Sequence, residues 1–432
     1  MPFDQRSPLP RAPIDRLARP VAHFMHIEAS SGFVLLGCTL LALALANSPL
    51  GPQVDAFWET KVGLHFGAVE LDHSLKHWIN DALMAVFFFV IGLEVKREIV
   101  HGELRDPRRA ALPIAAAIGG MLVPAVLFLA WIGDAPGRDG WGIPMATDIA
   151  FVVGCMALLG PRIPSSLRVL LLTLAIADDI GAILVIAIGY TEDLRLDWLA
   201  AGAAGIGVVA LLARLGVRSF GVYTLVGAVI WLCFHASGVH ATIAGVVLGL
   251  QTPARSYLDR TAAGRFLTEL DEAPAQAAGA ARVMRVARES VSPLEFLMHA
   301  LHPWVAFAIM PLFALANAGV AIGLESLTDP LSIAVELGLL AGKPLGILAF
   351  AWLAVRLRLT SLPERVTWPV LGAAGLLAGI GFTMAIFIAG LALSDAQLET
   401  AKVGILVGSG LSAALGMGLL WRLLPKPPRT TP

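Results

Sequence analysis

The chain has 432 residues, of which 57% are hydrophobic and only 15% are charged, and its formal net charge is −1. Soluble globular proteins carry about 25% charged residues, so this chain has too few charged side chains to cover a water-soluble body. The composition also gives no sign of nucleic-acid binding.

Long apolar runs divide the sequence, without the alternation that is typical of barrel strands. Backbone polar groups inside a bilayer need partners within the fold, which favours helices. Because a spanning helix needs about 20 mostly apolar residues, we predict an all-α integral membrane protein of about twelve transmembrane helices. The expected spans are residues 28–48, 80–97, 110–132, 141–160, 168–190, 197–213, 219–236, 239–252, 302–322, 331–354, 368–393 and 400–424.

The other segments form the two ends and one long connection. We expect a cytoplasmic N-terminal segment at residues 1–27, a polytopic domain at 28–424 and a cytoplasmic tail at 425–432. The polar stretch at about 253–301 is interpreted as a cytoplasmic linker inside the domain, and its residues 281–300 as a surface helix.

Basic residues alternate from one predicted loop to the next. Counted together with the adjoining ends of the spans, the N-terminal segment, every second loop after it and the C-terminal tail hold 25 of the 31 Lys and Arg residues. Because cytoplasmic loops are enriched in Lys and Arg, this alternation supports twelve spans and predicts that both termini are cytoplasmic.

Four ionisable residues stand out because they lie deep inside the predicted spans. Asp178 and Asp179 are adjacent in one apolar run, and two others contain Asp148 and Lys343. A charged side chain at a helix centre costs about 2.5–3.5 kcal/mol on the insertion scale. Lys343 can compensate one carboxylate but not three, so the remaining negative charge needs a cation or protons.

This surplus charge predicts cation transport. Carboxylate oxygens suit hard cations, and burial with mutual repulsion favours the protonated form. Protons and a metal cation therefore compete for one site, which is sufficient for exchange. We expect Asp178 and Asp179 to bind the transported cation and to carry protons, without a cofactor and without enzyme catalysis. Adjacent helical residues point about 100° apart, so the two carboxylates should have different roles.

Two segments, residues 142–148 and 379–383, are unsuited to an unbroken helix because Pro and Gly weaken a helix interior. Interrupted spans in matching positions of two halves point to a transporter site. Carboxylates stabilise helix N-terminal ends and cations C-terminal ends. The residues expected to support the site there are Thr147, Asp148, Lys343 and Thr383.

Other membrane proteins fit these charges less well. A channel needs a continuous polar pathway, whereas the charges here are few and clustered; a proton-coupled carrier of another substrate is the alternative within transport. An intramembrane aspartyl protease needs two facing aspartates, for which Asp148 and Asp178 are candidates. However, the chain has no Gly-x-Gly-Asp motif, and Lys343 would be an awkward neighbour.

Roughly residues 25–420 resemble the bacterial NhaA-type sodium/proton antiporters. The motifs that carry the resemblance are VFFFVIGLEVKRE at 86–98, ATDIAF at 146–151, AIADDIGAI at 175–183, SGVHAT at 237–242, LHPWVA at 301–306, AGKPLG at 341–346 and GFTMAIFI at 381–388.

The resemblance implies a fold with inverted-topology repeats and two discontinuous helices that cross near the membrane midplane. It implies electrogenic exchange that expels sodium, with lithium as a second substrate, from a bacterial inner-membrane homodimer. Asp179 would be a principal sodium ligand and proton carrier, while Asp178 would pair with Lys343 in one state. Thr147 and Asp148 would lie at the crossing.

The resemblance also implies activation at alkaline pH through a cytoplasmic cluster. The chain departs from the family pattern at Met298, where a regulatory acid is expected, and in the greater length of the 253–301 stretch. The candidate residues for pH regulation are Glu94, Arg97, Glu98, His240 and His302.

Overall fold

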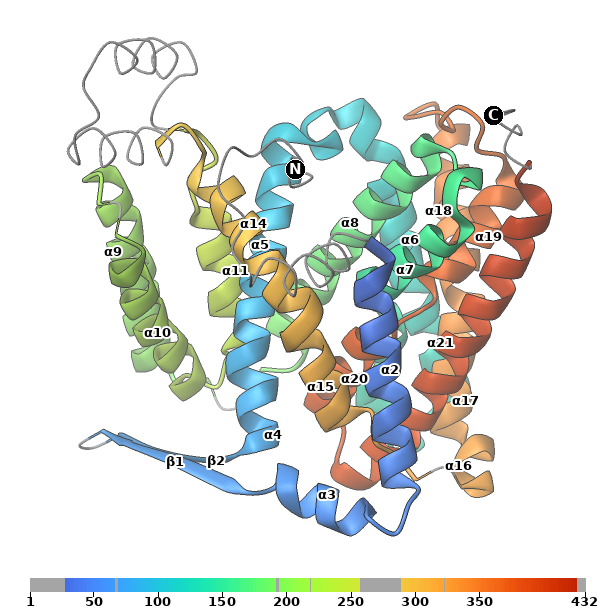
Figure 1. Cartoon of the computed structure of the whole chain (residues 1–432). Helices are drawn as coiled ribbons and strands as arrows, with labels where there is room; N and C mark the ends of the chain where they lie inside the picture. Colours follow the sequence, from blue (N-terminus) through green and yellow to red (C-terminus); the bar gives the residue numbers. More distant parts are fainter. Residues whose placement is uncertain are drawn as a thin grey trace, which may run out of the picture. The chain divides into compact units, whose positions relative to one another are not determined.

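Helices make up most of the chain in the computed structural model, which describes residues 28–66, 69–191, 194–217, 219–256, 289–321 and 323–425. Figure 1 shows these helices in chain order. The chain forms two compact units. Unit 1 consists of Met1–Asn80, Asp106–Tyr190 and Ala306–Pro432, and unit 2 of Asp81–Arg105 and Thr191–Val305.

Eight of the described helices are long and apolar enough to cross a membrane, and up to ten if each of two bent helix pairs is one span. Two shorter apolar helices, α10 (Phe220–Ala236) and α11 (Thr242–Gln251), overlap two more predicted spans. An all-α membrane protein is therefore confirmed. The count of twelve crossings and the inverted repeats stay predictions.

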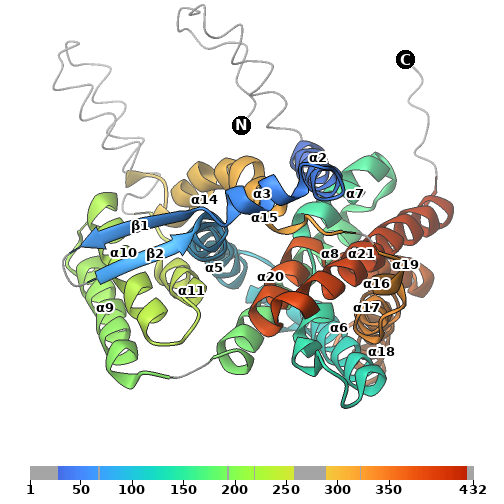
Figure 2. The same cartoon turned by 90° about the horizontal axis from the view of Figure 1, so that it is seen from below.

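Unit 1 begins with α2 (Glu28–Ala46) and α3 (Gly51–Trp58), followed by a β-hairpin that hydropathy does not predict. Its strands β1 (Lys61–Phe66) and β2 (Val69–Ser74) pair antiparallel (Figure 2). Each strand has only six residues, so its alternating apolar residues are averaged out in a window long enough to detect a membrane span.

Three long helices of the described chain contain a π-helical turn. These turns are η1 (Ile79–Leu83), η5 (Val305–Ile309) and η6 (Gly338–Gly342). Such turns appear frequently at functional sites. The turn η6 ends immediately before the buried Lys343, so the helix is locally wider just before this residue.

The helices of unit 1 pack around α6 and α21. The helix α6 packs against α8 and α18, and α21 packs against α17, α19 and α20. The bounds are α6 (Pro107–Ile132), η3 (Arg138–Met145), α7 (Ile149–Leu159), η4 (Gly160–Arg162), α8 (Ser165–Gly189), α15 (Met310–Asn317), α16 (Leu324–Thr328), α17 (Pro330–Leu337), α18 (Lys343–Arg356), α19 (Trp368–Ala378), α20 (Phe382–Ala392) and α21 (Asp395–Leu423).

Two glycines bring α6 and α18 into backbone contact. A Cβ atom on Gly119 would overlap the carbonyl oxygen of Gly346, and a Cβ atom on Gly346 would overlap that of Gly119. Small residues allow such close approach between membrane helices. The contact lies one turn after Lys343 and therefore fixes the helix that carries the buried ammonium.

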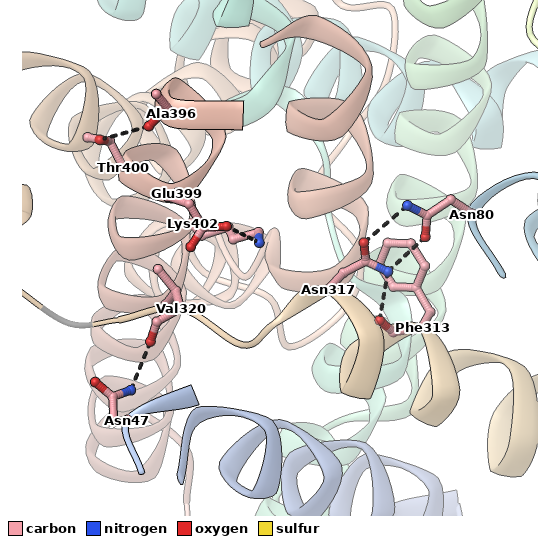
Figure 3. A network of polar contacts seen from close by, with 9 residues as sticks. All are labelled: Asn47, Asn80, Phe313, Asn317, Val320, Ala396, Glu399, Thr400 and Lys402. Atoms are coloured by element: carbon pink, nitrogen blue, oxygen red, sulfur yellow. Dashed lines mark hydrogen bonds and ion pairs between the residues drawn. The ribbon is translucent and has the colours of Figure 1, made fainter. Parts of the chain in front are cut away.

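Polar side chains also pair within unit 1, both between elements and inside one helix (Figure 3). Asn80 in η1 and Asn317 in α15 exchange two amide hydrogen bonds of 3.1 and 2.7 Å. In α21, the buried Lys402 pairs with Glu399 at 2.6 Å. These contacts satisfy buried donors and acceptors that would otherwise cost free energy.

Unit 2 contains α5 (Met84–His101), η2 (Glu103–Arg105), α9 (Leu196–Arg214), α10, α11 and α14 (Pro293–Trp304). The helices α5 and α11 approach closely at Gly92, Gly245 and Gly249. An apolar cavity of about 1030 Å³ lies among α5, α9, α10, α11 and α14.

The helix predicted at 302–322 begins earlier, at Pro293, because Ser292 accepts a hydrogen bond from the Glu295 N–H and Pro293 fits the first turn. Residues 293–300 of the predicted surface helix are helical and begin an apolar span candidate that ends at Asn317, so their place on the membrane surface stays a prediction. Residues 281–288 of that predicted helix lie outside the described part of the chain, as does most of the predicted linker.

The glycine contact predicts a difference between two Gly→Ala variants. Gly346→Ala should lower the melting temperature in detergent, because overpacking typically costs about 1–3 kcal/mol. The control is Gly410→Ala in α21, where a Cβ atom meets nothing within 4 Å. That change should be neutral or slightly stabilising, since Ala is the better helix former. Equal melting temperatures for the two variants would contradict the contact.

Candidate functional site

Two interrupted segments of unit 1 lie against each other. The first changes from 3₁₀-helix η3 to α7 through residues 146–148, and the second is bent by 51° between α19 and α20. The Asp148 N–H donates to the Ile380 carbonyl at 2.6 Å. The Thr147 hydroxyl lies 2.8 Å from the Ala378 carbonyl. The two interruptions predicted from Gly and Pro are therefore confirmed, and they are in contact.

Glycine allows this close approach at position 381. A Cβ atom there would lie 3.2 Å from the Ala146 carbonyl oxygen and 3.0 Å from side chains of Leu339 and Ala385. An added Cβ would require these neighbours to shift by a few tenths of an ångström, so glycine makes the close approach of the two breaks possible without that adjustment.

The Asp148 carboxylate accepts hydrogen bonds from the N-terminal ends of two helices. Asp148 accepts the Phe151 N–H of α7 at 3.2 Å through Oδ1 and the Thr383 N–H of α20 at 3.1 Å through Oδ2. The Thr383 hydroxyl also donates to Oδ2. Helix N-terminal ends carry partial positive charge. Asp148 is buried and therefore stabilises two of these ends at once.

Lys343 interacts with a C-terminal helix end, that of η3. Its ammonium is fully buried and donates to the Met145 carbonyl at the end of η3. The same ammonium lies 2.7 Å from Asp178 Oδ2, and both side chains are 0% exposed. Removing one partner of a buried ion pair leaves an uncompensated charge and destabilises the folded protein. The charged form of each of these two residues is therefore favoured by the charge of the other.

Asp178 and Asp179 lie in the middle of α8, and both are buried. Asp178 Oδ2 also accepts the Thr147 hydroxyl at 2.7 Å. Asp178 Oδ1 is buried and has no hydrogen-bond partner among the described residues. With Asp148, the site holds three buried carboxylates against the one ammonium of Lys343.

The Thr147 hydroxyl cannot satisfy both of its neighbours when Asp178 is ionised. It has one hydrogen, and both Asp178 Oδ2 and the Ala378 carbonyl lie within hydrogen-bond distance. A protonated Asp178 would donate to Thr147, leaving the Thr147 hydrogen for Ala378. The protonation state of Asp178 is therefore linked to the hydrogen bonding of the α19 end.

The structure thus brings together Thr147, Asp148, Asp178, Lys343 and Thr383 by direct contacts, with Asp179 next to Asp178. Three contributors have no clear sequence signal, because two are backbone carbonyls and one is a helical serine. These are the carbonyls of Met145 and Ala378 and the hydroxyl of Ser409, which accepts the Phe382 N–H at 3.1 Å.

Four of the candidates for pH regulation gather in unit 2. Glu94 lies 3.8 Å from His302, and Arg97 lies 3.9 Å from Glu98. Glu98 also accepts the Glu103 N–H at 2.9 Å beyond the end of α5. His240 lies just before α11, where its carbonyl accepts the Ile243 N–H.

Buried ionisable groups where two membrane helices are interrupted are typical of the binding sites of secondary transporters. The family model for "Na+/H+ antiporter 1" matches residues 22–420, and the chain belongs to this family. It is 55% identical to a Rhodopirellula baltica protein and 52% to a Rhizobium meliloti protein, with 99% of each chain covered in both cases. Both relatives carry the name Na(+)/H(+) antiporter NhaA.

The two contacts of Thr147 predict that its hydroxyl matters for stability. Thr147→Val keeps the shape but leaves buried acceptors on Asp178 and Ala378 without this donor, at a cost of about 1–3 kcal/mol. The melting temperature in detergent should fall for Thr147→Val and stay close to wild type for Thr147→Ser, which keeps the donor. A valine variant as stable as the serine variant would contradict the hydrogen bonds.

Proposed function

We propose that this chain is an electrogenic antiporter that expels sodium from the cytoplasm in exchange for protons. The observation that carries the proposal is the excess of buried carboxylates over ammonium groups at the broken helices. It is supported by Asp178 Oδ1, which has no hydrogen-bond partner among the residues that the structure describes. The names of the relatives support sodium and protons as the exchanged ions. We include lithium as a second substrate.

Sodium and protons compete for the same carboxylates in this proposal. Asp178 and Asp179 supply the hard oxygen ligands that an alkali cation prefers. The ion displaces the Lys343 ammonium from Asp178, and Lys343 keeps the Met145 carbonyl as a second partner. Protons from the opposite side of the membrane then neutralise the carboxylates and release the ion.

The charge count supports electrogenic exchange. One sodium ion carries a single positive charge, whereas two carboxylates take up two protons when both become neutral. If both Asp178 and Asp179 are protonated in each cycle, more protons than sodium ions cross the membrane. The proton-motive force then drives sodium out of the cytoplasm, which serves sodium and pH homeostasis.

We further propose that alkaline pH activates exchange through the residues of unit 2. His302 lies 3.8 Å from Glu94 and forms an ion pair with it only when its ring is protonated, so the pairing depends on pH. A rise in pH therefore removes this pairing, which Arg97 and Glu98 adjoin along α5. His240 is a further candidate for the same response. We place the protein in the bacterial inner membrane as a homodimer with cytoplasmic termini.

Ion exchange by everted membrane vesicles tests the proposed site. A pH-sensitive dye should report proton movement when sodium or lithium is added to wild-type vesicles, but not with potassium. Asp178→Asn and Asp179→Asn should each abolish the response while the folded protein is retained, because each change removes an ionisable ligand. Asp148 and Lys343 substitutions should change apparent affinity or stability more than they abolish exchange.

The control for these variants is Asp395→Asn, which removes an exposed acid at the start of α21. This variant should exchange ions like the wild type. Full exchange by the Asp179→Asn protein would contradict the proposal that Asp179 is part of the ion site.

A further inference from the structure

Tyr190, the residue that follows α8, binds the backbone of η3 through its side chain. Its hydroxyl donates to the Asp139 carbonyl at 3.0 Å and accepts the Gly142 N–H at 3.1 Å. These two backbone groups are three residues apart, the spacing at which a 3₁₀-helix pairs its own C=O and N–H groups. The hydroxyl therefore bridges one such pair in a kind of helix whose own hydrogen bonds have poor geometry.

The end of α8 and η3 also fit closely. A Cβ atom on Gly142 would lie 2.6 Å from the Tyr190 hydroxyl oxygen, and a Cβ atom on Gly189 would lie 3.3 Å from the Trp141 ring. The rings of Trp141 and Tyr190 have their centroids 6.2 Å apart. Because Tyr190 is only 8% exposed, both of its hydrogen bonds belong to the protein interior.

The ion site joins α8 to the first interrupted segment a second time. Asp178, about 18 Å before Tyr190 along the helix, accepts the Thr147 hydroxyl. Lys343 lies 2.7 Å from Asp178 and donates to the carbonyl of Met145, the last residue of η3. Tyr190 and Lys343 therefore hold the same short helix at different points, and α8 carries the partners of both contacts.

The Met145 carbonyl is the partner that Lys343 keeps when a cation takes the place of its ammonium at Asp178. Met145 comes three residues after Gly142, which is one turn of a 3₁₀-helix. Its position therefore depends on where Tyr190 holds η3. A buried ammonium without a partner is costly in a membrane, so a Lys343 whose carbonyl had moved would compete harder for Asp178.

We propose that Tyr190 is a positioning residue of the ion site, which acts on Lys343 through η3 and the Met145 carbonyl. Its hydroxyl holds η3 against α8, so that this carbonyl stays within reach of the ammonium while sodium occupies Asp178. The assignment rests on the proposed function and adds a residue beyond the two breaks to those that set the affinity for sodium.

Tyr190→Phe tests the assignment, because it removes the hydroxyl and keeps the ring. In the vesicle assay the apparent KM for sodium should rise about threefold to tenfold, the range expected for one hydrogen bond. The maximal rate at saturating sodium should stay close to that of the wild type, since both carboxylates of α8 are intact. The melting temperature should fall, because two backbone groups lose a partner.

The matched control is Tyr223→Phe in α10. The Tyr223 hydroxyl donates to the Val217 carbonyl at 2.9 Å, within unit 2. This change also removes a hydrogen bond between a tyrosine and the backbone, so the melting temperature should fall again. The KM for sodium should stay at the wild-type value, because this bond does not involve η3.

Gly142→Ala tests the same contact from the side of η3. The added Cβ atom would overlap the Tyr190 oxygen, so this variant should also have a raised KM. In the double variant with Tyr190→Phe the overlapping oxygen is absent. The two effects should therefore sum to less than their separate values, as expected for residues in contact.

A wild-type KM in Tyr190→Phe, with any melting temperature, would overturn the assignment, and so would an equal rise of KM in Tyr223→Phe. KM does not depend on the amount of folded protein, so a variant of reduced stability still gives a decisive value. Failure of this inference alone leaves exchange by the wild type intact, whereas a wild-type protein that exchanges no sodium would overturn the proposed function as well.

Discussion

The ion pair between Lys343 and Asp178 is the constraint on which the rest of the site depends. Both groups are fully buried at 2.7 Å, yet the same site holds Asp148 and Asp179 as well. Charges in a membrane interior are expensive unless they are paired. One ammonium neutralises one carboxylate, so the site retains negative charge that a small cation or protons must balance.

The broken helices supply the rest of the compensation. Asp148 accepts N–H groups from two helix N-terminal ends, and Lys343 donates to the carbonyl that ends η3. The interruptions therefore stabilise two of the charges that the membrane disfavours. The backbone contact between Gly119 and Gly346 holds Lys343 in place. In the proposed mechanism, exchange takes place at Asp178 and Asp179 while the contacts of Asp148 and Lys343 keep the surrounding charges in place.

Sequence patterns predict the helices, the two interruptions and the buried charges, because each depends on local composition. They do not predict the β-hairpin, whose strands are shorter than a hydropathy window, or the early start of α14 at Pro293, which depends on a cap. Nor do they predict the roles of the Met145 and Ala378 carbonyls or of Ser409. Those contacts exist only where distant segments cross, and a backbone carbonyl has no residue type that would mark it.

The most direct test of competition at the carboxylates is calorimetric titration of purified protein with sodium in buffers of different ionisation enthalpy across pH. The account predicts that sodium binding releases protons and that the apparent Kd rises as pH falls, by about tenfold per pH unit for each proton displaced. Asp179→Asn should remove this response. A sodium Kd independent of pH, with no protons released, would contradict the account.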